Sequence, residues 1–134
     1  MTWTGWLEVT EAVLLAERIE VIERGYEFLL AYAAQGRQDD AGTEVRETLD
    51  HMHLALTGMQ GSLLAAFPNL SPLTGVRDFM ETVEHDVRAA RGAIGLVLSR
   101  VRISSLLVDN LNASVHLRAL LTDLFLIEQA LKGE

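Results

Sequence analysis

Cysteine is absent from this 134-residue chain, and proline occurs only at Pro68 and Pro72. The lack of cysteine excludes disulfide frameworks, thiolate metal sites, iron–sulfur clusters and cysteine nucleophiles. Proline inside a helix removes a hydrogen bond and clashes with the preceding turn. The long stretches before Pro68 and after Pro72 are free of this obstacle, so they permit long helices.

Basic side chains are scarce, since ten arginines and the single Lys132 stand against 19 acidic residues. The net charge of −8 makes nucleic acid and anionic membranes poor partners for this acidic chain. The near-exclusive use of arginine indicates a GC-rich, bacterial genome. The first residues are acidic where a secretory leader would be basic. No apolar run approaches the ~20 residues of a membrane span, so we expect a cytoplasmic protein.

Apolar residues make up 49% of the chain, which is enough for one domain, residues 1–134, with a hydrophobic core. They recur at steps of three and four, which is the helical period, and no segment alternates as a strand would. Helices are expected at residues 6–34, from about 40 or 43 to 67, at 72–102, where Gly92 or Gly95 could form a break, and at 105–132. The sequence therefore predicts an all-α fold, an up-down-up-down four-helix bundle with long antiparallel helices.

The last predicted helix carries two apolar stripes, although one face of a four-helix bundle needs only one. A helix that is apolar on two sides is either central or lies at a subunit interface. Because a four-helix bundle has no central helix, the second stripe predicts a homodimer. The residues expected at this interface are Leu117, Leu121, Leu124 and Phe125.

One pattern occurs twice, at residues 47–61 and again at 81–95. Its form is E-T-[LV]-[DE]-H-x3-A-x2-G-x2-G. Each copy sets a glutamate and a histidine one helical turn apart, on one face of its helix. Imidazole and carboxylate groups on converging helices are how bundle cores bind zinc, iron or manganese. The candidate metal ligands are therefore Glu47, His51, Glu81 and His85.

The two copies are expected to face each other across a seam between the second and third predicted helices. Folding these helices back at residues 68–69 places His51 level with His85. The same register sets Gly58 and Gly92 against the neighbouring helix. The structural interpretation of this seam is close packing around small residues, with no metal and no other cofactor. Both interpretations predict that the two histidines lie near each other.

Positive charge is concentrated between residues 87 and 108, which hold four arginines and no acidic residue. These arginines either pair with the acidic first helix, in the same subunit or its neighbour, or form a docking site for an acidic protein partner or a phosphorylated ligand. They are Arg88, Arg91, Arg100 and Arg102.

The sequence contains neither a phosphate-binding loop nor a nucleophile elbow, which argues against an enzyme. We therefore expect a non-enzymatic interaction or assembly protein that acts as a homodimer. The alternatives are the metal-binding bundle and a small-ligand binder or enzyme that uses the bundle core.

Overall fold

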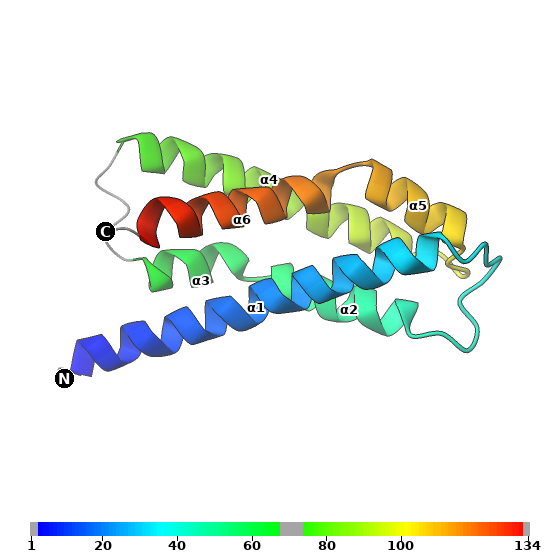
Figure 1. Cartoon of the computed structure of the whole chain (residues 1–134), viewed down its shortest axis with the longest axis horizontal. Coiled ribbons are helices and arrows are strands. Elements are labelled where there is room, and N and C mark those ends of the chain that lie inside the picture. Colours follow the sequence, from blue (N-terminus) through cyan, green and yellow to red (C-terminus); the bar gives the residue numbers. More distant parts are fainter. Residues whose placement is uncertain (1–2, 68–73, 133–134) are drawn as a thin grey trace.

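A computed structural model of the chain describes residues 3–67 and 74–132, and all regular structure in these two ranges is helical (Figure 1). The described residues form six helices: α1 Trp3–Ala33, α2 Val45–Leu56, α3 Met59–Ala66, α4 Thr74–Leu98, α5 Ser105–Ala113 and α6 His116–Lys132. The all-α prediction is confirmed. Four uninterrupted helices are not found, because two of the predicted helices are each divided. The predicted start at Pro72 lies outside the described residues.

The helices run back and forth along the long axis of the molecule. The chain follows α1 to one end, returns through α2 and α3, runs out again along α4, and returns through α5 and α6 (Figure 1). α1 packs against α2, α3 and α5, whereas α4 packs against α6 and α2. One continuous core joins all six helices. Its largest fully buried side chains come from α1, α2, α3, α4 and α6 and from the α4–α5 connection: Ile22, Leu29, Tyr32, Leu49, Met52, Leu56, Met59, Leu63, Ile94, Ile103, Leu117 and Leu120.

Gly58 divides the second predicted helix into α2 and α3. Its φ of 87° lies in the left-handed region, which glycine enters without the steric cost that a side chain imposes. Arg18 of α1 fixes this break, because its Nη1 donates to the carbonyl oxygens of Ala55 and Thr57, each at 3.0 Å. These are carbonyls that the end of α2 leaves without a helical partner.

Val115 divides the last predicted helix into α5 and α6. Its φ is 59°, which is unfavourable for a β-branched residue and costs about 1–2 kcal/mol relative to right-handed backbone. By contrast, α4 continues through Gly92 and Gly95 to Leu98, so the break considered there does not occur. The sequence contains glycine at three candidate break points, yet only one of these glycines interrupts a helix.

Polar contacts join the two connections at one end of the molecule, residues 34–44 and 99–104, which we call the loop end. The hydroxyl of Tyr32 lies 2.5 Å from the carbonyl oxygen of Ile103. The buried hydroxyl of Ser105 donates to the carbonyl of Tyr32 at 2.7 Å and accepts from the amide of Arg37 at 2.8 Å. The start of α5 is therefore tied to the end of α1.

Asp40 and Arg46 complete the loop end. One carboxylate oxygen of Asp40 accepts from the amide of Ile103 at 2.9 Å, and the other accepts from Nε of Arg46 at 3.2 Å. The guanidinium of Arg46 also donates to the carbonyls of Leu98 and Arg100 at 3.0 and 2.9 Å. This arginine therefore holds the end of α4 against the start of α2.

Candidate functional site

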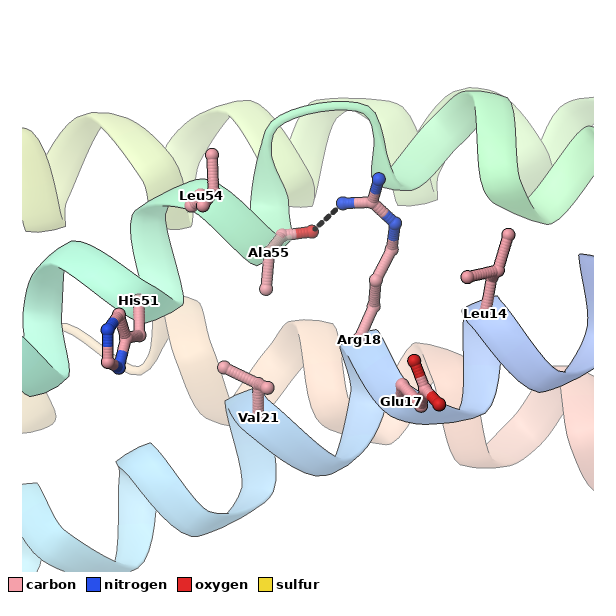
Figure 2. Close-up of a pocket in the computed structure, with 7 residues that line it drawn as sticks. All are labelled: Leu14, Glu17, Arg18, Val21, His51, Leu54 and Ala55. Atoms are coloured by element: carbon pink, nitrogen blue, oxygen red, sulfur yellow. Dashed lines mark hydrogen bonds between the residues drawn. The ribbon is translucent and has the colours of Figure 1, made fainter.

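A groove of about 420 Å³ lies between α1 and α2, and we call it the α1–α2 groove (Figure 2). α1 supplies four of its lining residues and α2 supplies three: Leu14, Glu17, Arg18, Val21, His51, Leu54 and Ala55. A second hollow of about 300 Å³ shares Val21 and His51 with it and extends along α1 to Phe28. The two hollows form one long depression along the α1–α2 contact.

The lining of the α1–α2 groove combines exposed apolar side chains with charges of both signs. Leu14, Val21 and Leu54 are 45%, 37% and 69% exposed. Arg18 reaches across the groove from α1 to the carbonyl of Ala55 (Figure 2). Glu17 lies beside it on α1. Exposed aliphatic side chains gathered at an open groove are typical of a contact surface for another protein.

The close approach of α1 and α2 depends on Gly25. A Cβ at this position would overlap Sδ and Cγ of Met52, which is fully buried. An alanine at this position would therefore require the buried Met52 side chain to shift. The sequence reasoning assigned this role to Gly58 and Gly92 instead. No atom of the described residues lies within 4 Å of a Cβ built on Gly92, and Gly58 forms the helix break.

The four predicted metal ligands do not come together. His51 lines the α1–α2 groove, whereas His85 on α4 lies with its Nδ1 3.3 Å from Oδ1 of Asp86. Both histidines are exposed, and so are Glu47 and Glu81. Within the described parts of the chain, no three histidine, aspartate or glutamate side chains are grouped to hold a metal ion. The structure therefore does not bring these four residues together as one metal site.

The observed register of α2 against α4 differs from the predicted one. A continuous helix to residue 67 would have placed His51 level with His85. Instead, Arg46 bonds to the carbonyl of Leu98, and His53 lies 3.8 Å from a Cβ built on Gly95. α2 therefore packs along the C-terminal half of α4, and His85 lies nearer the other end of that helix.

The four predicted docking arginines are divided between a helix and a connection. Arg88 and Arg91 belong to α4, and Arg100 and Arg102 belong to the 99–104 connection. Arg88 pairs with Glu84 of its own helix at 3.5 Å. In the ranges that the structure describes, none of the four forms an ion pair with α1. The expected pairing with the acidic first helix is therefore not found.

Three of the four residues predicted to form the dimer interface on the last helix are buried within the single chain. Leu117, Leu121 and Leu124 are at most 7% exposed within the single chain, and only Phe125, at 44%, reaches the surface. The second apolar stripe has a different physical cause from the one expected. α6 packs against α4, α1 and α5, so more than one of its faces is covered by its own chain.

Asp86 of α4 and Asp123 of α6 form a cluster that the sequence reasoning did not identify. Each of the two carboxyl groups acts on the pKa of the other. Burial, together with the neighbouring carboxylate, raises the pKa of Asp123 to about 7. The hydrogen bond from Asp123, followed by the one from His85, lowers the pKa of Asp86. One proton of the pair therefore titrates near neutral pH. The signal was visible in the sequence, because Asp123 is one of the few charges between the leucines of α6.

Comparison with family models, curated proteins and solved structures gives no match for this chain. Functional conclusions therefore come from the residues themselves. Among the described helices, none has the length and apolar character needed to cross a membrane.

Proposed function

We propose that the chain is a non-enzymatic interaction protein of the bacterial cytoplasm that acts as a homodimer. Its six helices form an up-down-up-down four-helix bundle. α2 and α3, divided at Gly58, together make the second helix of this bundle, and α5 and α6, divided at Val115, make the fourth. The observation that carries the proposal is the α1–α2 groove, where Leu14, Val21 and Leu54 leave aliphatic surface exposed beside charged groups.

A second copy of the chain is the proposed occupant of the groove. In a two-fold dimer the same patch meets itself, so a patch of one charge sign would repel its partner. The chain as a whole is acidic, but this face is balanced. Glu17 and Arg18 lie in the groove, and an exposed pair, Glu20 with Arg24 at 2.6 Å, lies one turn further along α1. Local charge balance therefore favours self-association here despite the net charge of −8.

Sedimentation equilibrium at micromolar concentration tests the proposal. The wild-type chain is expected at twice its mass of 14.8 kDa. Leu54→Asp places a charge in the groove and is expected to give monomers. Leu106→Asp on α5 is the matched control, because Leu54 and Leu106 are both 69% exposed. This variant is expected to stay dimeric.

Two results would contradict the proposal in different ways. A wild-type chain that sediments as a monomer at micromolar concentration would contradict the homodimer. A dimer that Leu54→Asp leaves intact would show that the interface lies elsewhere.

A further inference from the structure

The long depression along the α1–α2 contact has its midpoint at Val21 and His51. Among the described residues, these two line both of its hollows. Leu14 precedes Val21 by seven residues on α1, and Phe28 follows it by seven. At 1.5 Å per residue, these two positions lie roughly 10 Å from the midpoint, in opposite directions. The α1 wall of the depression therefore has an apolar side chain at its centre and one at each end.

Opposite charges lie on the two sides of this midpoint. Glu17 precedes Val21 by four residues and Arg24 follows it by three, so each is about one helical turn away. At about 100° per residue, Glu17 and Arg24 project within roughly 20° of each other, on one face of α1. Glu17 lines the first hollow and Arg24 lines the second. The face that borders the depression is therefore negative on one side of Val21 and positive on the other.

Both charges are available to a second chain. Glu17 is exposed, and no ion pair or side-chain hydrogen bond joins it to any of the described residues. Arg24 pairs with Glu20 at 2.6 Å, but the two side chains are 78% and 54% exposed. An exposed pair of this kind contributes little, and a guanidinium has five N–H donors, so Arg24 can also bind a carboxylate of another chain.

A two-fold axis through the midpoint, perpendicular to α1, brings two copies of this helix together in opposite directions. Residues at similar distances before and after Val21 then face each other. Glu17 of each copy faces Arg24 of the other, and Leu14 of each copy faces Phe28 of the other. In a parallel pair of helices each residue would face its own copy, so Glu17 would repel Glu17 and Arg24 would repel Arg24. The order of charges along α1 therefore favours the antiparallel pair.

The charges of α2 fit the same axis. Its exposed acidic residues Glu47 and Asp50 both precede His51, whereas Leu54 follows it. An antiparallel pair of α2 helices centred at His51 sets these acids beside His51 and Leu54 of the second copy. The α2 wall therefore adds no pair of facing acids that would oppose the dimer.

We propose that the homodimer forms around this midpoint, with the two α1 helices antiparallel and Glu17 of each copy paired with Arg24 of the other. This inference rests on the proposed homodimer and adds its register. Arg18 also lines the groove, but its Nη1 already donates to two carbonyl oxygens at the end of α2. Its role is to hold the break within its own chain, and the pairing between chains belongs to Glu17 and Arg24.

Charge reversal with complementation, followed by sedimentation equilibrium of the full chain, tests the register. Glu17→Arg sets arginine against arginine at both pairs, and Arg24→Glu sets glutamate against glutamate. Each variant alone is expected to have a dimer Kd at least about tenfold above that of the wild type. An equimolar mixture of the two variants restores both attractive pairs, so it is expected to form heterodimers with close to the wild-type Kd.

Two control variants make the same charge changes away from this face. Glu27→Arg reverses an exposed carboxylate of α1 that lines neither hollow. Arg88→Glu breaks an exposed pair with Glu84 on α4, one turn apart like the pair of Arg24 with Glu20. Both controls are expected to keep the wild-type Kd. A single chain with Glu17→Arg and Arg24→Glu together exchanges the two charges and is expected to form homodimers again.

The results separate failure of the register from failure of the homodimer. A wild-type chain that stays monomeric overturns the homodimer and the register with it. A wild-type dimer that Glu17→Arg or Arg24→Glu leaves intact overturns the register alone. Variants that dissociate but do not associate when mixed also overturn the register, because their charges then do not face each other.

Discussion

The connection between α1 and α2 and the contact between α4 and α6 each contain an aspartate, and the pKa values of the two aspartates shift in opposite directions. Asp40, at the loop end, accepts hydrogen bonds from the amide of Ile103 and from Arg46. These bonds, led by the one from Ile103, lower the pKa of its carboxyl. Asp123 is buried next to Asp86 instead, and its pKa rises to about 7. The number of hydrogen-bond donors that face each carboxyl group therefore favours ionisation of Asp40 over ionisation of Asp123.

The same contrast extends to the backbone. On the α1–α2 side the one sharp break falls on a glycine, and the freed carbonyls accept from Arg18. On the α4–α6 side the break falls on Val115, for which the backbone is strained. At the first break the freed carbonyl oxygens have hydrogen-bond donors. At the second break Val115 is strained, and Oδ2 of Asp123 on α6 has no donor among the described residues.

The largest expected effect is at Asp40. Asp40→Ala leaves the amide of Ile103 without its acceptor and removes the partner of Arg46. It is expected to lower the free energy of unfolding by about 2–3 kcal/mol. Urea unfolding at pH 7 measures it, and Asp109→Ala, at an exposed carboxyl, is the control, with a change within about 0.5 kcal/mol. Equal effects of the two variants would contradict the role of the loop end.

The next effect distinguishes the close α1–α2 packing from the exposed face of α4. Gly25→Ala forces a Cβ into Met52 and is expected to cost about 1–2 kcal/mol, even though alanine is the better helix former. Gly92→Ala meets no atom and is expected to stabilise the chain by about 1 kcal/mol. Thermal unfolding of both variants measures the difference. A Gly25 variant as stable as the Gly92 variant would show that α1 and α2 pack less closely.

Asp123→Asn is expected to stabilise the chain at pH 8 by about 1 kcal/mol, because the amide donates to Asp86 without adding a second negative charge. The raised pKa sets the sign. The proton on Asp123 contributes fully to the free energy of unfolding below pH 3.8, which is the carboxyl pKa in the unfolded chain. This contribution is lost as the pH rises through the folded pKa of about 7. The advantage of the variant should therefore be larger at pH 8 than at pH 5, as measured by urea unfolding. A constant advantage would contradict the shared proton.

The smallest expected effect is at the α5–α6 junction. Val115→Gly removes the Cβ that makes left-handed backbone unfavourable at this position. The variant is expected to raise the free energy of unfolding by up to about 1 kcal/mol. The exposed side chain of Val115 contributes little packing that could be lost. Differential scanning calorimetry measures the change, and destabilisation by more than about 1 kcal/mol would show that the backbone there is not strained.

The sequence predicts the helical class well and the helix breaks poorly. Steps of three and four between apolar residues determine which faces are buried, so the helical ranges are recovered to within a few residues. Gly58, Gly92 and Gly95 look alike in the sequence, but only Gly58 adopts a positive φ. Nothing in the residue type of Val115 indicates left-handed backbone, since valine disfavours it.

The candidate sites were mostly missed for the same physical reason. Pairing of His51 with His85 assumed that the second and third predicted helices fold back directly at residues 68–69, whereas α2 packs along the C-terminal half of α4. The α6 stripe was identified as apolar, but whether another helix of the same chain covers it depends on long-range packing. Asp123 within that stripe was the one visible sign of the α4–α6 carboxyl pair, because a charge between buried leucines requires a specific partner.

Titration of the aspartate side chains by carbon-13 NMR of their carboxyl groups tests the contrast between the two sides most directly. We expect Asp40 to titrate below the ordinary value of 3.8 and Asp123 to titrate near pH 7. Asp123→Asn should remove the high-pH transition and leave that of Asp40 in place. If both carboxyl groups titrate together near 3.8, Asp123 is not protonated at neutral pH, and the proposed difference between the α1–α2 side and the α4–α6 side is contradicted.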